Sequence, residues 1–320
     1  MKPTRTLWLT FATIAATAAL VTSSAVSASA DPPAEQPRHS FAEYQGIPIS
    51  IYEYGPSADE APTLVTTGGW PGDSTIFETA ARKLATKYHV VRYDQRGEGL
   101  SGHNTTDELN SLENLADEFG AVIDKTAPGK HVHVFTEGWG SFLTSEYQFR
   151  HPGRIASLSA IGAPSLDLAH YALVESGRDP AEFVKNMPNI VWYGALSTPA
   201  LPELMAASGF DEAFFGAGVA SAGDPPVTMS KEDMVASVSR YRASLPTRLG
   251  YAPAYSFLEV PIMQVFQSPD DSPAMITGLA GHTNNLWLTE IEGSHTNFAA
   301  KSWPLVSAEL DKAIAATEHR

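Results

Sequence analysis

The run from His131 to Ser141 most constrains what this chain can fold into, because it passes from a strand-forming segment through one tight turn into a helix-compatible segment. Its first part, HVHVFTE, is rich in β-branched and aromatic residues, which favour a buried strand. Gly138 and Gly140 follow within a few residues, and small residues let a backbone turn sharply. The pattern predicts a strand, a turn with residue 138 at its apex, and a helix.

Strand and helix patterns alternate on both sides of this unit. Strands are predicted at 63–67, 89–93, 155–161, 261–266 and 286–291, and helices at 74–85, 111–126, 139–151 and 303–316. Such alternation implies parallel strands joined by helical crossovers, and therefore an α/β fold with a mostly parallel, doubly wound sheet. The segment from Phe41 to Tyr54, interrupted by Gly46, adds two early strands with the pattern of a hairpin.

One long segment breaks this rhythm. Between 165 and 260 the chain is rich in Gly, Pro, Met and Tyr and has short amphipathic pieces at 181–184 and 231–245. We interpret it as a helical lid inserted into a core formed by 41–164 and 261–320. Its tyrosines, and the Phe214-Phe215 pair, are candidates to line an apolar pocket; the tyrosines are Tyr171, Tyr193, Tyr241, Tyr251 and Tyr255.

The first residues have the pattern of a signal peptide. Lys2 and Arg5 form a positive end, residues 7–21 are apolar, and small residues precede a cleavage point near Ala30. The apolar run, roughly 15 residues long, is shorter than the ~20 that a spanning helix needs. We therefore expect residues 1–30 to be removed, leaving a secreted, extracellular chain with a disordered, Pro-rich leader at 31–40 and no membrane attachment.

Composition excludes several functions. The formal net charge of −15 argues against nucleic acid as a partner, because dense Lys and Arg are needed to displace counterions from phosphates. The chain has no cysteine, so there is no disulfide, cysteine nucleophile or thiolate metal site. His131 and His133 share a strand face but lack a further ligand at metal-binding spacing. We expect no metal and no cofactor, and the number of subunits stays open.

The turn sequence resembles a known family. The run through Gly138 resembles the nucleophile elbow of α/β-hydrolases, G-x-S-x-G, in which the middle residue attacks the substrate. Gly-Trp-Gly-Ser is similar to the S-W-G-S elbow of prolyl iminopeptidases with Ser replaced by Gly138, and to the D-W-G-S elbow of some epoxide hydrolases with Asp replaced. The resemblance covers about 48–168 and 261–298. It implies an α/β-hydrolase fold whose attacking side chain is missing.

The same resemblance implies a proton-transfer pair. The segment 292–298 follows the last strand and resembles the family's G-x-G-H-F turn, which makes His295 the expected base. The segment 267–271 resembles the G-x-x-D turn, which makes Asp270 the expected acid, with Asp271 as the alternative. A buried carboxylate there would fix the imidazole tautomer and stabilise its protonated form.

Backbone N–H groups complete the expected site. GGWPG at 68–72 looks like the family's H-G-x-P-G loop with His replaced. It implies that the N–H of Trp139 and that of Gly69 or Trp70 converge on a developing negative charge, an effect worth roughly 3 kcal/mol per donor. Glu137 either holds a water or a substrate cation, with a pKa raised by desolvation, or forms a buried ion pair behind the elbow.

Two other motifs are not expected to take part in catalysis. Asp94 to Gly99, DQRGEG, resembles the D-Q-R-G-x-G turn of prolyl iminopeptidases, and we expect Asp94 and Arg96 to tie loops together. Ser141 lies three residues along the helix from Gly138, so its side chain should point elsewhere and is not a substitute nucleophile.

Three functions are compatible with these residues. The first is a secreted enzyme that uses His295 and Asp270 for general acid/base chemistry on a small organic molecule, by elimination, isomerisation, cyclisation or addition of water. The second is a degenerate hydrolase that binds a ligand without converting it. The third is a secreted aminopeptidase or esterase whose nucleophile has been changed to glycine, which would cost on the order of 10⁶ in kcat.

Overall fold

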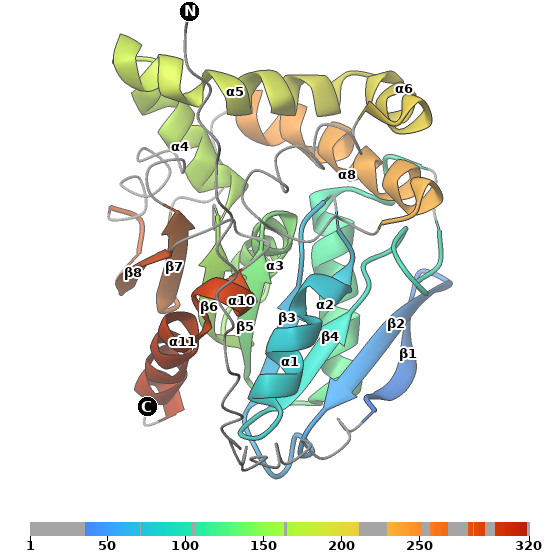
Figure 1. Ribbon diagram of the computed structural model, residues 1–320, viewed down its shortest axis with the longest axis vertical. Helices are drawn as coiled ribbons and strands as arrows, with labels where there is room; N and C mark the ends of the chain where they lie inside the picture. The colour runs from blue at the N-terminus through green and yellow to red at the C-terminus, as the bar shows by residue number, and fades with distance from the viewer. Residues whose placement is uncertain are drawn as a thin grey trace, which may run out of the picture. The chain divides into compact units, whose positions relative to one another are not determined.

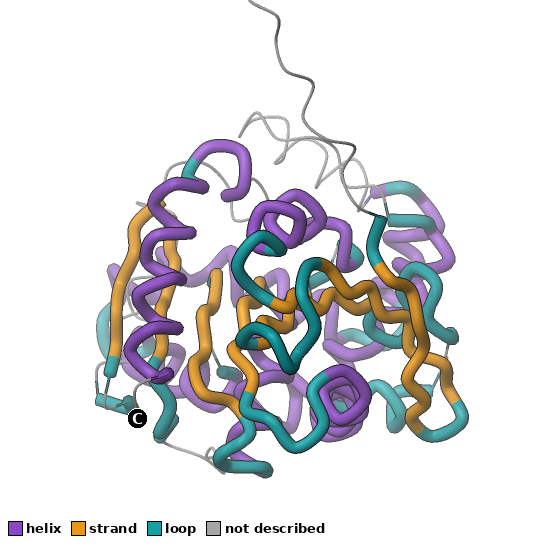
Figure 2. Tube along the Cα trace, turned by 90° about the horizontal axis from the view of Figure 1, so that it is seen from below, coloured by secondary structure: helices purple, strands orange, loops and turns teal. Residues whose placement is uncertain are grey.

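The computed structural model describes residues 36–70, 72–103, 106–162, 165–210, 229–250, 257–267, 281–283, 285–291 and 298–318. They form an eight-stranded sheet of order β1-β2-β4-β3-β5-β6-β7-β8, with helices on both sides (Figures 1 and 2). The strands are β1 (Arg38–Tyr44), β2 (Ile47–Tyr54), β3 (Thr63–Thr67), β4 (His89–Tyr93), β5 (Val132–Glu137), β6 (Ile155–Ile161), β7 (Ile262–Gln267) and β8 (Leu286–Ile291).

The sheet is parallel from β4 to β8, and described helices connect β3 to β4, β4 to β5, β5 to β6 and β6 to β7. β1 and β2 form an antiparallel hairpin whose turn places Gln45 and Gly46 at positive φ. The predicted α/β class with a mostly parallel sheet is confirmed. The leader predicted at 31–40 extends too far, because β1 starts at Arg38, where the long β2 still offers Glu53 as a pairing partner.

Two apolar layers cover the sheet. On one face lie η1 (Ser74–Phe77), α1 (Glu78–Leu84), α10 (Phe298–Lys301) and α11 (Trp303–Glu318). Phe77, Phe135 and Phe298 meet there with ring centroids 5.2 to 5.6 Å apart. On the other face lie α2 (Leu112–Thr126), capped by the Ser111 side chain, and α3 (Trp139–Arg150). The helices predicted at 111–126 and 139–151 correspond to α2 and α3.

Between β6 and β7 the described chain contains α4 (Leu166–Ser176), α5 (Pro180–Ser197), α6 (Leu201–Ser208) and α8 (Lys231–Gly250), which we call the helical insertion. α5, α6 and α8 lie beyond the carboxyl ends of the strands (Figure 1). The amphipathic pieces expected at 181–184 and 231–245 are parts of the longer α5 and α8. Within the described residues, no helix has the length and apolar character to cross a bilayer.

Candidate active site

Gly138 occupies the turn between β5 and α3. Its φ of 52° and ψ of −121° lie in a region that L side chains rarely adopt. Its N–H donates to the Ile161 carbonyl on β6 at 3.0 Å, which fixes the turn against the neighbouring strand. The backbone therefore has the sharp strand-to-helix geometry that presents a nucleophile in an elbow, although residue 138 has no side chain.

The two glycines of the turn are constrained differently. A Cβ added at Gly140 would lie 2.3 Å from the Thr67 carbonyl oxygen, so glycine is needed there for α3 to approach β3. Among the described residues, the atom nearest to a Cβ added at Gly138 is Gly69 Cα at 3.4 Å, which is ordinary van der Waals contact. Packing therefore requires glycine at 140 and leaves room for a side chain at 138.

Ser141 does not replace the missing nucleophile. Its side chain is fully buried, and its Oγ lies 2.9 Å from Thr136 Oγ1 on β5. The hydroxyl is directed back into the strand rather than toward the turn apex. The expectation that Ser141 points elsewhere is confirmed.

The loop after β3 packs directly on the elbow. Gly69 donates its N–H to Glu137 Oε2 at 2.8 Å, and the Glu137 side chain is buried. A Cβ added at Gly69 would lie 2.8 Å from the Trp139 nitrogen, so glycine is needed for this approach. Of the two donors expected from this loop, the Gly69 N–H is engaged by the Glu137 carboxylate, and Trp70 stays the other candidate.

Trp139 is the first residue of α3, and the first N–H groups of a helix have no carbonyl partner within it. These amides also lie at the positive end of the helix dipole. A helix start that directly follows the turn apex therefore supplies one donor for negative charge. Trp70, from the loop packed on the elbow, is the candidate for the second.

Aromatic side chains cover this region. Tyr241 of α8 lies with its ring centroid 4.6 Å from that of Trp139 and 5.8 Å from that of Trp70, and its hydroxyl donates to the Trp70 carbonyl at 3.3 Å. Tyr193 of α5 stacks on Tyr241 at 6.4 Å. Burial raises the pKa of the Tyr241 phenol well above its usual range, so the phenol remains protonated. The helical insertion thus shields the elbow with apolar surface.

The expected proton-transfer residues, His295, Asp270 and the alternative Asp271, lie outside the described residues, as do Pro71, Tyr251, Tyr255, Phe214 and Phe215. The strands that lead to His295 and Asp270 are described. β7 ends at Gln267 and β8 at Ile291, both parallel to β5. Carboxyl ends of parallel strands share one sheet edge, so β7 and β8 both end at the edge where Gly138 lies.

Comparison with known proteins agrees with this architecture. The family model described as alpha/beta hydrolase fold matches residues 62–188, less than half of the chain. A variant of an epoxide hydrolase from Bacillus megaterium superposes with a TM-score of 0.67 at 15% identity, covering 88% of this chain and 100% of that one. An epoxide hydrolase from metagenomes of hot environments gives 0.67 at 16%, covering 88% and 99%.

This chain has the α/β-hydrolase fold. Among curated proteins, it is 28% identical over 286 residues to the "Probable oxidoreductase EphD" of Mycobacterium tuberculosis, covering 82% of this chain and 47% of that protein. Epoxide hydrolase A of the same organism is 23% identical (49% and 48% covered), and a proline iminopeptidase of Heyndrickxia coagulans is 27% identical (37% and 40% covered). The chain spans about half the length of these relatives. The predicted resemblance to α/β-hydrolases, with relatives among epoxide hydrolases and proline iminopeptidases, is confirmed.

In this α/β-hydrolase fold the DQRGEG turn has a structural role. Arg96 is fully buried and binds Glu118 of α2 at 2.6 Å, and it also donates to the Leu109 carbonyl. Asp94 accepts hydrogen bonds from Tyr52, Ser74 and the Leu100 N–H. Burial raises the pKa of both the Asp94 and the Glu118 carboxyl groups. Asp94 and Arg96 tie loops together, as expected from the sequence.

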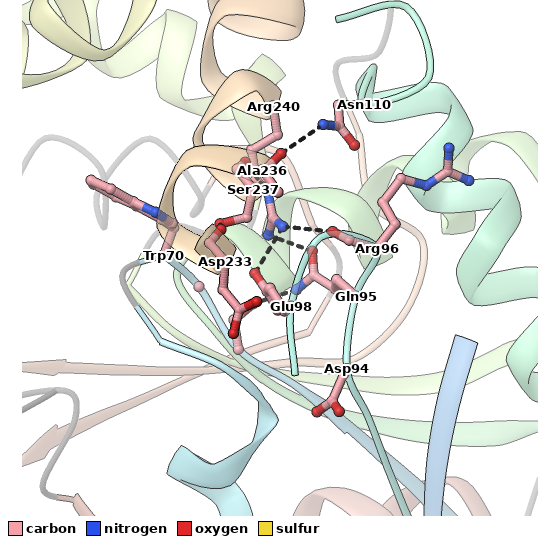
Figure 3. A network of polar contacts seen from close by, with 12 residues as sticks. Trp70, Asp94, Gln95, Arg96, Glu98, Asn110, Asp233, Ala236, Ser237 and Arg240 are labelled. Atoms are coloured by element: carbon pink, nitrogen blue, oxygen red, sulfur yellow. Dashed lines mark hydrogen bonds and ion pairs between the residues drawn. The ribbon is translucent and has the colours of Figure 1, made fainter. Parts of the chain in front are cut away.

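Sequence reasoning missed a buried polar network behind the loop after β3. Arg240 of α8 reaches the DQRGEG turn, where it binds Glu98 at 2.8 Å and Gln95 Oε1 at 2.8 Å (Figure 3). Gln95 in turn donates to Thr67 Oγ1 and the Gly68 carbonyl. Burial raises the pKa of Glu98 to about 8, and nearby Arg240 limits the rise. α8 carries several arginines, and no sequence pattern distinguishes the buried one.

Metal ligation finds no support in the part of the chain that the structure describes, which contains no group of three or more His, Cys, Asp or Glu side chains arranged to hold an ion. His133 is buried, and its Nδ1 lies 2.8 Å from Ser157 Oγ, which accounts for this imidazole in the core.

Proposed function

We propose that this chain is an enzyme that adds water to a small, electrophilic organic molecule, such as an epoxide or an ester, without a covalent intermediate at residue 138. The observation that carries the proposal is Gly138, which keeps the backbone of a nucleophile elbow and has clearance for a side chain, but offers no attacking atom. Several relatives in sequence and fold are named epoxide hydrolases, which supports this substrate class. Secretion after cleavage near Ala30 belongs to the same proposal.

The proposed reaction uses His295 as the base and Asp270 as the group that orients it. The imidazole takes a proton from water as the water oxygen bonds to a ring carbon, and the carbon–oxygen bond of the epoxide breaks. The resulting alkoxide is stabilised by the N–H groups of Trp70 and Trp139. The imidazolium then returns its proton to the alkoxide, giving a diol and restoring the neutral base.

The room at Gly138 fits this sequence of steps. In a covalent hydrolase, an oxygen or carboxylate of the elbow residue lies above the helix start and attacks first. Here the nearest described atom to the Cβ position is Gly69 Cα at 3.4 Å, which supports the proposal that a water takes the place of the missing side chain. Direct addition by an activated water is then the simplest route that needs no side chain at 138.

A single-turnover experiment in H₂¹⁸O tests the route. The enzyme is held in excess over styrene oxide. Direct addition places ¹⁸O in the diol during the first turnover. A first-turnover diol without the label would show that an enzyme carboxylate attacks before water, and the proposal would be wrong.

Variants then test the residues. His295→Ala should abolish turnover of the converted probe, because no other base is assigned to the water. Asp270→Asn and Asp271→Asn are compared with each other, and the one that loses more activity identifies the orienting acid. Turnover by His295→Ala equal to that of the parent would exclude the acid/base mechanism.

A second candidate, a peptidase or esterase whose nucleophile was replaced, is favoured by the intact elbow backbone and by the proline iminopeptidase relative. Gly138→Ser should then acquire hydrolysis of aminoacyl p-nitroanilides that the parent lacks. Binding of probes without any product, by parent and variant alike, would instead support a ligand-binding protein.

A further inference from the structure

We propose that Arg240 of the helical insertion is a positioning residue: acting through Gln95, it fixes the Gly68–Gly69 peptide unit and so restrains the direction of the N–H of the next residue, Trp70. The structural link stands by itself, whereas its effect on turnover rests on the function proposed above. It couples a helix of the insertion to the loop that supports the elbow.

Arg240 is held on all sides by acceptors. Its side chain is fully buried, its Nε donates to the Ser237 carbonyl at 2.8 Å, and its Nη2 binds Glu98 at 2.8 Å. Its Nη1 donates to Gln95 Oε1 at 2.8 Å. A guanidinium is planar and its N–H groups form a fixed fork, so contacts on three nitrogens determine its orientation.

This orientation decides which way the Gln95 amide faces. A guanidinium has donors only, so the Gln95 group opposite it must be the carbonyl oxygen. The Gln95 NH₂ therefore faces the other way, where it donates to the Gly68 carbonyl at 2.7 Å and to Thr67 Oγ1 at 2.9 Å. Without Arg240, the amide could rotate and present an acceptor to the Gly68 carbonyl, which would repel it.

The Gly68 carbonyl and the Gly69 N–H belong to one planar peptide unit. Gln95 holds the carbonyl end, and Glu137 Oε2 holds the N–H end at 2.8 Å. Both ends of the unit are thus fixed by side chains from different segments. Gly69 also packs closely on the elbow, with its Cβ position 2.8 Å from the Trp139 nitrogen, so a fixed 68–69 unit leaves the next N–H, that of Trp70, little freedom of direction.

The buried ion pair between Arg240 and Glu98 requires the desolvation of two charges, which costs free energy. Burial of two charges is often no better for stability than well-packed apolar residues of similar size. Burial also disfavours the charged form of Glu98. The DQRGEG turn also packs closely on α8, because a Cβ added at Gly97 would lie 3.1 Å from the Ala236 carbonyl carbon. The network is better suited to setting geometry than to adding stability.

The test uses three variants. Arg240→Met removes the link at the helix. Gln95→Glu keeps an acceptor for Arg240 but removes the donor to the Gly68 carbonyl. The matched control is Arg242→Met, on the same helix, whose guanidinium binds Asp107 and Glu203, each at 2.8 Å, away from the loop.

The direct readout is the Trp70 amide by NMR. Of the 6 tryptophans, only Trp70 and Trp139 follow a glycine, so protein labelled with ¹³C-carbonyl glycine and ¹⁵N-tryptophan gives two correlated amide signals. Arg240→Met and Gln95→Glu should both shift the Trp70 signal, and Trp139 should move less. Arg242→Met should leave both signals in place. A folded Arg240→Met protein with an unshifted Trp70 signal would overturn the proposal.

Turnover supplies the second readout, with styrene oxide as the probe. Misplacement of one donor by a fraction of an ångström to 1 Å should lower kcat by up to about 10²-fold, with a smaller change in KM. If the parent converts no probe, the proposed reaction fails, yet the NMR signals still decide whether Arg240 sets the loop. A shifted Trp70 signal with unchanged kcat would overturn the positioning role while leaving the reaction intact.

Discussion

Replacing Gly138 by alanine should destabilise the protein only by the strain of its backbone conformation. The added Cβ meets its nearest atom, Gly69 Cα, at 3.4 Å, so no steric term is expected. A residue other than glycine in a rarely populated region of φ and ψ costs about 1–3 kcal/mol. At roughly 3 °C per kcal/mol for a chain of this size, Tm should fall by about 3–9 °C.

Two further glycine-to-alanine variants serve as controls. The free energy of unfolding of each variant is measured in urea and compared at constant m value. Gly129→Ala also introduces a side chain at positive φ (71°), in open space, and should isolate the backbone cost. Gly140→Ala would place its Cβ 2.3 Å from the Thr67 carbonyl oxygen and should be the most destabilising of the three, because α3 must move away from β3. If Gly138→Ala costs as much as Gly140→Ala, residue 138 has no room for a side chain, and the proposed approach of water is wrong.

Three further predictions concern buried charge and the elbow. Arg96→Met should lower the free energy of unfolding by about 3–5 kcal/mol in urea, because it leaves the buried Glu118 carboxylate uncompensated. Burial raises the pKa of Glu98 to about 8 and that of Glu146 to about 7, so the folded state holds these protons more tightly than the unfolded state. Their stabilising contribution is full below the ordinary carboxyl pKa of 4.5, falls as pH rises above it, and is lost once pH has passed about 7 to 8. Glu98→Gln with Glu146→Gln should flatten that part of the stability profile. Gly138→Asp should change the label pattern in H₂¹⁸O, with the first-turnover diol unlabelled, since an elbow carboxylate would then attack before water.

Much of the fold follows from short-range pattern. The strands at 63–67, 89–93, 155–161 and 286–291 have the bounds predicted from the sequence. β3 and β4 are buried along their whole length, as is typical of inner strands of a parallel sheet, whereas β8 stands at the sheet edge and exposes Trp287 and Leu288. α8 continues past its predicted end at 245, because it contains Pro246, which a local reading takes as a helix end. α5 is also longer than the predicted piece at 181–184. In α5 one proline stands at the first helical position, where its missing N–H costs little.

Part of the candidate site could also be predicted from the sequence, and part could not. Gly138, Trp139 and the loop at 68–70 could be predicted because each stands at the carboxyl end of a strand, where chain position fixes location. The engagement of the Gly69 N–H by Glu137 could not, because it depends on how two loops from different strands meet. Arg240 was missed for the same reason: its partners lie 142 to 145 residues earlier in the chain, and α8 has other arginines that make surface ion pairs.

The elbow shows why the loss of a nucleophile need not disturb the fold around it. The close approaches that shape the turn are made by the backbone of Gly69 and Gly140, and the hydrogen bond to Ile161 is made by the main-chain N–H of residue 138. None of them uses a side chain at 138. Substitution there changes which atom can attack, while the helix start that stabilises negative charge is set by α3 and β5. A chain with this backbone can therefore pass between covalent hydrolysis, direct addition of water and ligand binding by changes at few positions. The H₂¹⁸O experiment with styrene oxide separates attack by an enzyme carboxylate from direct addition of water, and binding alone gives no product.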